Sequence, residues 1–146
     1  GLKKRMDSGN ELGFELEEYL LPAAGGRLVC PPGLEPMKLT AGLAVDPSRK
    51  HPLKISRPRI NRESLRYRLP PGLEIESLPA GKVISGEFGS YSLSVSRTAN
   101  GFALERRGLV LPQTVSPENY PRFRAFCREV DEAEKIRVIL RRGTGK

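Results

Sequence analysis

The fold of this chain is decided by residues 91–104, YSLSVSRTANGFAL. Serines alternate there with three apolar residues, Tyr91, Leu93 and Val95. This period-two pattern is typical of a strand with one buried face. Asn100 and Gly101 tolerate the positive φ of a type I′ hairpin turn, and Phe102 and Leu104 continue the alternation beyond it. The stretch therefore predicts a β-hairpin.

The predicted two-residue turn also determines which side chains share a face. Arg97 would face Leu104, and Val95 would face Arg106. Odd positions before the turn then lie on the same face as even positions after it. The apolar residues of both strands therefore point to one side, so turn chemistry and hydrophobic phase agree.

Upstream of the hairpin, shorter alternating runs predict further strands at residues 53–55, 65–69 and 73–75. Residues 70–72, PPG, end the second of these strands, and Pro79 ends the third. The region before them, residues 31–52, contains five prolines and is predicted to be ordered surface loop, because a central strand cannot hold so many residues without an N–H. Three leucines are expected to hold this loop against the core: Leu34, Leu39 and Leu43.

The first thirty residues predict less structure. Residues 14–20 alternate apolar and polar side chains, with an interruption at Glu18, and are predicted to form a strand. Residues 21–26, LPAAGG, are expected to turn the chain, and residues 27–30, RLVC, fit a short return strand. Residues 1–11 are polar and unpatterned, so we expect them to be a flexible lead-in.

One amphipathic helix is predicted near the C-terminus. Its apolar residues recur at steps of three and four: Tyr120, Phe123, Phe126, Cys127, Val130 and Ala133. Ser116 and Pro117 resemble a cap and a first helical residue, but Pro121 lies too far in for that start. We therefore expect a single turn at 117–120, a main helix from about Pro121 and a last strand over 136–141. The outer face of the helix carries charged residues: Arg122, Arg124, Arg128, Glu129, Asp131 and Glu132.

Together these elements predict a mainly β fold, an antiparallel β-sandwich of immunoglobulin-like type with one C-terminal amphipathic helix followed by a last strand. A chain of 146 residues suits one domain with one core. We expect residues 12–146 to form this domain, with residues 12–48 either completing the sandwich or linking it to a preceding domain. No apolar run approaches the roughly 20 residues of a membrane span.

Residues that could perform chemistry are scarce. His51 is the single histidine and lies in a proline-rich loop, where a surface position is expected. Cys127 lies on the apolar face of the predicted helix. Cys30 precedes Pro31-Pro32, where a thiol can be exposed, but a nucleophilic thiol also needs a base within hydrogen-bond reach. One histidine and two distant cysteines offer no zinc-ligand spacing. We predict no catalytic residue, no cofactor and no metal site, and leave open whether Cys30 and Cys127 pair.

The formal net charge of +8 is compatible with an anionic partner, although the charges are spread along the chain. The densest group, and the single candidate binding site, is formed by Arg57, Arg59, Arg62, Arg66 and Arg68. Four further arginines can extend it: Arg106, Arg107, Arg137 and Arg141. We expect these side chains to be solvated and paired with Glu63, Glu74, Glu76 and Glu105. Single-stranded nucleic acid would need interleaved aromatic residues, and Tyr67 falls on the opposite face, so nucleic acid is not an expected partner.

Four short motifs occur in an order that resembles one protein family. They are LPPG at 69–72, LP at 78–79, FGSY at 88–91 and ENYPRFRAF at 118–126. With the strands around them they resemble the uncharacterised C-terminal domain that follows a transglutaminase-like core in secreted Bacteroidetes proteins. The resemblance covers about two-thirds of the chain, from Arg49 to Arg141, and residues 1–48 match less clearly.

The resemblance implies a β-sandwich accessory domain located in the periplasm or outside the cell. It also implies a longer parent protein, in which a Cys-His-Asp core lies upstream and is the partner of this domain. Those catalytic residues belong to the core, so nothing carries over to Cys30, Cys127 or His51.

Three functional hypotheses follow. The first is a non-catalytic accessory domain that packs on, or positions substrate for, the transglutaminase-like (cysteine-protease-like) domain, which predicts an exposed apolar patch. The alternative is a stand-alone binder of an acidic glycan or nucleic acid, which predicts a contiguous arginine-rich face and salt-sensitive binding. The third, a thiol enzyme, requires a reactive Cys30. None of these hypotheses predicts an oligomeric state.

Overall fold

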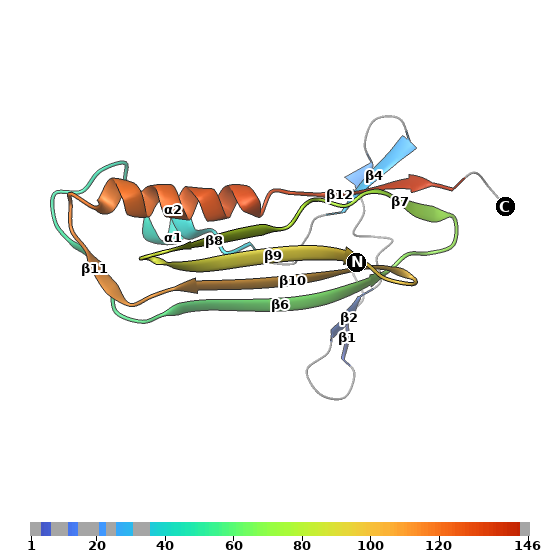
Figure 1. The fold of residues 1–146 in the computed structure, drawn as a ribbon, viewed down its shortest axis with the longest axis horizontal. Helices are drawn as coiled ribbons and strands as arrows, with labels where there is room; N and C mark the ends of the chain where they lie inside the picture. The colour runs from blue at the N-terminus through green and yellow to red at the C-terminus, as the bar shows by residue number, and fades with distance from the viewer. Residues whose placement is uncertain (1–3, 7–11, 15–20, 23–25, 31–35, 144–146) are drawn as a thin grey trace.

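The computed structural model describes residues 4–6, 12–14, 21–22, 26–30 and 36–143. Figure 1 shows a long four-stranded sheet, a helix that runs along one face of it, and a second, smaller sheet beyond the C-terminal end of that helix. Of the predicted strand at residues 14–20, only Phe14 lies within the described residues, and Leu34 lies outside them.

The main sheet is antiparallel throughout. Its strands are, in spatial order, β6 (Arg59–Arg68), β10 (Gly101–Val110), β9 (Gly89–Arg97) and β8 (Lys82–Gly86). Strand β10 lies at the centre, where it pairs along its whole length with β6 and from Phe102 onward with β9. Because side chains alternate along each strand, one face of this sheet is apolar and the other polar.

The second sheet is also antiparallel and joins segments distant in the sequence. Its order is β3 (Leu21–Pro22), β4 (Arg27–Cys30), β12 (Val138–Arg142) and β7 (Leu73–Ser77). Two further strand pairs are β1 (Lys4–Met6) with β2 (Leu12–Phe14), and β11 (Gln113–Val115) with β5 (Leu53–Ile55). The chain passes from β6 in the main sheet to β7 in the second sheet, and returns to the main sheet at β8.

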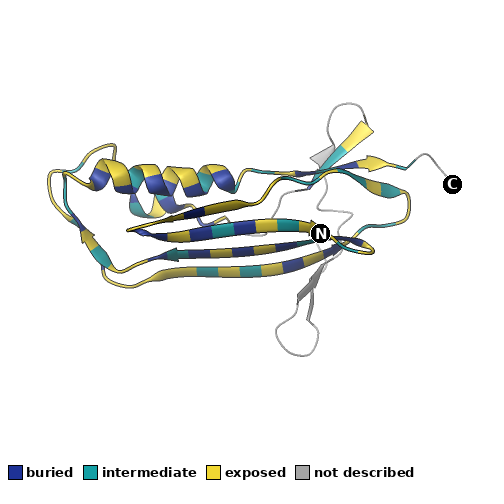
Figure 2. Cartoon of the chain, in the orientation of Figure 1, coloured by how far each residue is buried: buried dark blue, intermediate teal, exposed yellow. Residues whose placement is uncertain are grey.

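Helix α2 (Tyr120–Ala133) covers the apolar face of the main sheet, and the short helix α1 (Leu39–Leu43) packs beside it. All six apolar residues predicted for the core face of α2 are buried. Figure 2 shows dark buried positions on the side of α2 that faces the sheet and at alternate positions of β9 and β10. Phe88 and Phe123 join two of the motifs, because their rings meet edge to face at 5.3 Å.

The start of α2 agrees with the prediction of a single turn followed by a helix. The N–H of Tyr120 donates to the carbonyl of Ser116 at 2.9 Å, and the Ser116 hydroxyl accepts the N–H of Asn119 at 3.2 Å. Pro121 then lies in the first turn of the helix, where its missing N–H leaves no intrahelical bond unmade.

The prediction of continuous loop over residues 31–52 is wrong at α1. This helix has five residues and no side-chain cap of its own, and Lys38 before it has φ of 52°. Its caps come from α2: Asp131 accepts the N–H groups of Leu39 at 2.9 Å and Thr40 at 3.1 Å, and Arg124 donates to the carbonyl of Ala44 at 3.0 Å. Two residues predicted for the solvent face of α2 therefore bind α1, with charges that suit its dipole.

The predicted hairpin is present, with a register that differs from the expected one by two residues. Arg97 faces Phe102 rather than Leu104, and the N–H of Thr98 donates to the carbonyl of Gly101 at 2.9 Å. None of the residues from Thr98 to Gly101 has a positive φ, so the type I′ prediction is wrong. A shift of two residues keeps every side chain on its face, and the predicted shared apolar face is confirmed.

Gly101 is required for a different reason. A Cβ at this position would collide with the backbone carbonyl of Tyr67 on the neighbouring strand β6. The Asn-Gly pair therefore marks a close approach of two strands instead of a positive φ. The turn at Gly72 is the one that needs glycine for its conformation: φ is 90°, Pro71 precedes it, and the N–H of Leu73 donates to the carbonyl of Pro70 at 3.3 Å.

The predicted mainly β fold, with antiparallel sheets and a C-terminal helix followed by a last strand, is confirmed. In the sandwich-like arrangement, α2 and the second sheet lie over the main sheet, and a single apolar core joins them. Strand β8 was not predicted. Among the described residues, no helix has the length and apolar character needed to cross a membrane.

Candidate functional site

The main sheet divides the arginine group that the sequence singles out. Arg62, Arg66 and Arg68 occupy alternate positions of β6 and are exposed on the face turned away from α2. Arg59 has the opposite phase, since it faces the buried Val110 across the sheet. Its guanidinium lies against α1, where a Cβ on Gly42 would be 2.7 Å from Nη1. Arg57 is exposed in the connection between β5 and β6.

We call the exposed side of the main sheet the outer face. It consists of the even-numbered residues 60–68 of β6, the odd-numbered residues 103–109 of β10, the even-numbered residues 90–96 of β9, and Val83 and Ser85 of β8. Arg107 belongs to it and lies directly opposite Arg62, so four arginines share this face with one acidic residue, Glu105. The four positions on β9 are all serine.

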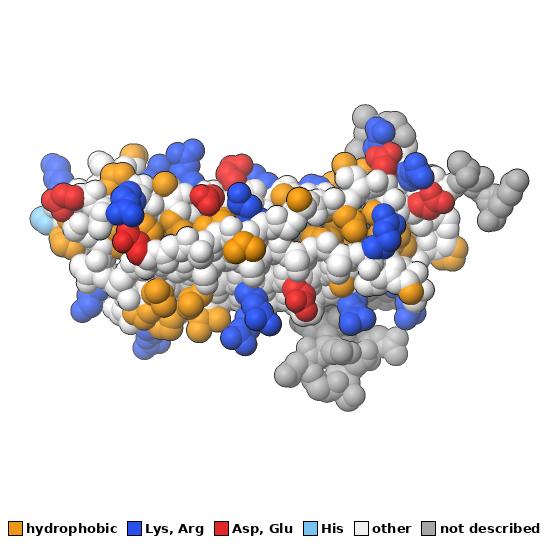
Figure 3. Space-filling view, viewed as in Figure 1, with side chains coloured by type: hydrophobic (Ala, Val, Ile, Leu, Met, Phe, Trp, Pro, Cys, Tyr) orange, Lys and Arg blue, Asp and Glu red, His pale blue; other side chains and the backbone are white. Residues whose placement is uncertain are grey.

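Figure 3 shows Lys and Arg side chains spaced along the lower edge of the molecule, where β6 runs, and hydrophobic side chains gathered at its left end. Two exposed aliphatic residues of the outer face are Ile60, which is 63% exposed, and Val83, which is 78% exposed. Ile60 lies directly opposite the partly buried Leu109. The outer face thus combines arginines, small hydroxyls and a few exposed aliphatic side chains.

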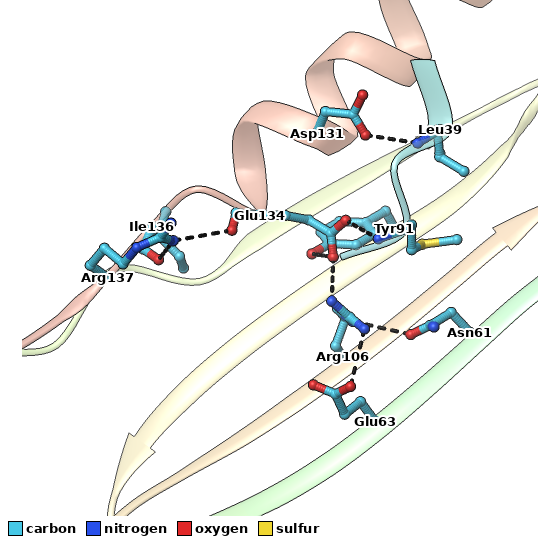
Figure 4. A network of polar contacts seen from close by, with 10 residues as sticks. Leu39, Asn61, Glu63, Tyr91, Arg106, Asp131, Glu134, Ile136 and Arg137 are labelled. Carbon is cyan, nitrogen blue, oxygen red and sulfur yellow. Dashed lines mark hydrogen bonds and ion pairs between the residues drawn. The ribbon is translucent and has the colours of Figure 1, made fainter. Parts of the chain in front are cut away.

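Arg106, one of the four arginines named as a possible extension of the basic group, is instead buried within the domain, with 3% of its surface exposed. It has the same phase as Phe102 and Leu104 and therefore points toward α2. Figure 4 shows its guanidinium between two carboxylates: Nη1 is 2.5 Å from Oε2 of Glu134, and Nη2 is 3.2 Å from Oε2 of Glu63.

Further hydrogen bonds complete this network. Nε of Arg106 donates to Oδ1 of Asn61 at 3.1 Å. Glu134 accepts the Tyr91 hydroxyl at 3.2 Å through Oε2 and the N–H of Met37 at 2.8 Å through Oε1. Burial, followed by the negative charge of Glu134, raises the pKa of Tyr91 above its ordinary value. Tyr91 therefore stays protonated and donates to Glu134.

The network can join elements, but a ligand cannot reach it. The side chain of Glu134 is 4% exposed and that of Glu63 is 14% exposed. Glu134 follows the end of α2, Arg106 comes from the centre of the main sheet, and Met37 precedes α1. The network therefore ties both helices to the sheet. Its members were missed as a group because they are far apart in the sequence, although the phase of Arg106 placed it on the apolar face.

Of the carboxylates expected to pair with the arginine group, Glu63 pairs with Arg106 and Glu74 pairs with Arg141 at 3.2 Å. Glu76 pairs with Arg27 at 2.6 Å. Within the part of the chain that the structure describes, Glu105 and the four arginines of the outer face form no ion pair.

Both cysteines are buried and neither forms a disulfide, so the position before Pro31-Pro32 does not expose the Cys30 thiol. Burial raises the pKa of the Cys30 thiol and of the Cys127 thiol from 9.0 to about 12. Neither thiol has the low pKa or the access of a reactive nucleophile. His51 lies exposed in its loop, as predicted. The described residues contain no cluster of three or more His, Cys, Asp or Glu side chains suited to a metal.

An open hollow of about 600 Å³ lies at the end of the main sheet where β6 and β9 finish. Residues 69–75, residues 97–101 and Arg141 line it. The LPPG motif forms one wall of the hollow. Its proline and glycine residues make the turn at this end of the sheet. The ion pair of Glu74 with Arg141 lies in the same hollow.

Comparison with known proteins identifies the family of this fold. A family described as "Domain of Unknown Function with solved-structure structure (DUF3858)" matches residues 27–140, which is more than three-quarters of the chain. The chain belongs to this family. Its match begins at β4 and ends within β12, so it takes in the main sheet, both helices and most of the second sheet.

A solved structure has a similar fold. The crystal structure of a "putative protease" from Parabacteroides distasonis superposes with a TM-score of 0.57 at 15% sequence identity. The similarity covers 81% of this chain but 24% of the Parabacteroides protein, so this chain spans about a quarter of that protein's length. At this identity the likeness establishes the fold alone. No curated protein matched the sequence.

Proposed function

We propose that this chain is a non-catalytic accessory domain of a larger protein and that it packs against a neighbouring domain of that protein. One observation carries the proposal: the fold covers 81% of this chain yet only 24% of the Parabacteroides protein. A domain of this kind therefore occurs within a longer chain. Membership of a family of unknown function is compatible with this role.

We further propose that the neighbour is a transglutaminase-like core, similar to a cysteine protease, in a secreted or periplasmic protein. The order of the LPPG, LP, FGSY and ENYPRFRAF motifs supports this assignment, as does the source of the structural neighbour, a Bacteroidetes protein described as a protease. The buried cysteines support the non-catalytic role of this chain, because thiols whose pKa is raised to about 12 are poor nucleophiles for such a reaction.

The exposed aliphatic residues of the outer face support a docked role. Ile60 and Val83 each leave more than half of their surface to solvent, and Leu109 lies beside Ile60. Interfaces between domains of one chain bury about 600–1,500 Å² and are more polar than permanent interfaces. A face that mixes arginines, serines and a few aliphatic residues has this character.

An acidic glycan as ligand is the second candidate, and the four arginines of the outer face favour it. They lie on one face and form no ion pair within the described part of the chain. Such binding would weaken steeply with salt. We rank it second because no aromatic residue occurs at the described positions of the outer face, and aromatic side chains supply much of the stacking with sugars and bases.

Urea unfolding of this chain alone and within the intact parent tests the proposal. A neighbour whose effective concentration is 100 times its dissociation constant for the folded domain stabilises that domain by about 2.7 kcal/mol. The domain should then unfold at higher urea concentration in the parent than alone. Equal midpoints would show that the domain is independent. His51→Ala provides a second test, since it should leave any peptidase activity of the parent unchanged, whereas a loss would indicate a catalytic histidine.

A further inference from the structure

We propose that the outer face of the main sheet is the surface through which this domain docks, and that its occupant is an acidic surface of the neighbouring domain in the same protein. This inference rests on the proposed function and adds to it the surface and the chemistry of the partner.

The two faces of the main sheet differ in their cover. Helices α1 and α2 bury the inner face, where Leu93, Phe102 and Leu104 are fully enclosed. On the outer face, Arg62, Arg66, Arg68 and Arg107 are all exposed. A second layer could therefore be added to this sheet only on its outer side.

The charges of the outer face are arranged for an anion. Arg62 and Arg107 lie directly opposite each other on neighbouring strands, where like charges destabilise a sheet. Glu105 is the single acidic residue among the described positions, so the four arginines retain an excess of three positive charges. An acidic partner would remove the repulsion between Arg62 and Arg107, and the arrangement is therefore more favourable when the face is covered.

The residue types indicate carboxylate groups as the ligands. Arginine presents a planar fork of donors that matches a carboxylate in two parallel hydrogen bonds. The serines at positions 90–96 of β9 have short side chains, so a partner surface can approach the strand closely and find hydroxyl groups there. Large side chains would prevent that approach.

The aliphatic residues indicate that these carboxylates belong to a protein. Ile60 and Val83 are the exposed aliphatic residues of this face, and burying them against a partner is favourable because it removes apolar surface from water. Arginine is enriched at protein interfaces, while lysine is depleted there. The outer face contains four arginines and, at its described positions, no lysine.

Thiol labelling tests the inference and requires no choice of contact residues on the partner. Ser94→Cys places a thiol in the middle of the outer face, on an exposed strand position where the substitution is nearly isosteric. Cys30 and Cys127 are buried, so in this chain alone a maleimide reports on the introduced thiol. In the parent, mass spectrometry of the peptide that holds the introduced thiol distinguishes its labelling from that of any cysteine in the core. Ala125→Cys on the exposed side of α2 and Ser48→Cys in the loop after α1 are the matched controls.

Each variant is labelled in this chain alone and in the intact parent. The inference expects labelling at Ser94→Cys to be at least tenfold slower in the parent, with unchanged rates at Ala125→Cys and Ser48→Cys. Slow labelling at a control position, with fast labelling at Ser94→Cys, would overturn the inference and leave the proposed function standing, because the domain would dock through another face. Fast labelling at all three positions, with equal urea midpoints, would overturn both.

Charge reversal tests whether the protection of Ser94→Cys depends on the positive charges of the outer face. Arg62→Glu with Arg107→Glu should restore fast labelling of Ser94→Cys in the parent, whereas the lysine replacements at both positions should retain most of the protection. Arg128→Glu, an exposed change on α2, should have no effect. Protection that persists after the double reversal would overturn the acidic partner. Protection of this chain by heparin, without protection in the parent, would overturn the inference in favour of a glycan.

Discussion

Replacing Arg106 by methionine tests the role of the buried network most severely. Methionine retains much of the volume of arginine but removes its charge and its donors. Oε2 of Glu134 would lose its ion pair at 2.5 Å, and Oε2 of Glu63 would lose its contact at 3.2 Å. Two carboxylates would then remain near each other in the interior. The side chain of Glu134 is 4% exposed, so hydrogen bonds to water could not replace its lost ion pair.

The expected loss of stability follows from these contacts. Breaking a buried ion pair by removing one partner costs about 3–5 kcal/mol, because a charge is left buried without compensation. Glu134 keeps the hydrogen bonds from Tyr91 and from the Met37 N–H, and these limit the loss of stability to that range. Arg106→Met should therefore lower the free energy of unfolding by about 3–5 kcal/mol. Arg107→Met, at the next residue on the outer face, should change it by no more than about 0.5 kcal/mol.

Urea unfolding followed by circular dichroism measures both variants, and a double variant gives the coupling. The double variant Arg106→Met with Glu134→Gln removes the negative charge of Glu134, which Arg106 no longer pairs with, and retains an acceptor for the N–H of Met37. The double variant should be more stable than Arg106→Met alone. If Arg106→Met were as stable as Arg107→Met, or if the second substitution lowered stability further by its full amount, the network would not hold the helices to the sheet.

Three further predictions concern single positions. Asp131→Ala should lower the free energy of unfolding by about 0.5–2 kcal/mol, because α1 loses the acceptor at its N-terminus, and hydrogen exchange at Leu39 should accelerate with it; unchanged exchange would show that α1 does not depend on this cap. Gly101→Ala should cost about 1–3 kcal/mol in the same urea assay, because its Cβ meets a carbonyl of β6, and a neutral result would contradict the close approach. The folded-state pKa of Cys127 and of Cys30 is raised from 9.0 to about 12, so the stability that these neutral thiols contribute is complete below pH 9 and is lost as the pH rises toward 12. Cys127→Val should therefore make the decline of the free energy of unfolding at alkaline pH shallower. An identical decline in the variant would refute the raised pKa.

The spacing of apolar residues predicted the elements that have one apolar face and one polar face. The apolar residues of α2 recur with helical spacing, and all of those predicted to be buried are buried. The hairpin of β9 and β10 kept its predicted faces although its register differed, because a shift of two residues leaves the phase of a strand unchanged. Patterning therefore established which side chains point to the core.

Elements that depend on tertiary contacts were not predicted. Strand β8 has one buried residue, Ile84, while Val83 beside it is exposed, so its sequence shows no alternation. Helix α1 is five residues long and takes both caps from α2, through Asp131 and Arg124. The five prolines around it indicate loop, and a helix this short produces no local signal against them.

The candidate site was predicted in part. Arg66 and Arg68 lie at even spacing in the strand predicted over 65–69, so their shared face follows from the sequence. Arg62 joins them because β6 begins at Arg59, six residues before the predicted strand. The addition of Arg107 required the register between β6 and β10. Arg106 was named as a possible part of the basic surface on its charge alone, although its phase matches the apolar residues of β10. Phase is the better guide where the two disagree and a carboxylate is available inside.

Titration of this chain with the separately expressed region that is proposed to precede it in a longer parent tests the docking claim most directly. The region must first be shown to be folded, and calorimetry at low ionic strength then compares the unaltered chain, the double reversal Arg62→Glu with Arg107→Glu, and the control Arg128→Glu. We predict saturable binding by the unaltered chain and by Arg128→Glu, with affinity reduced at least tenfold by the double reversal. Absence of binding by the unaltered chain to a folded preceding region would contradict the account.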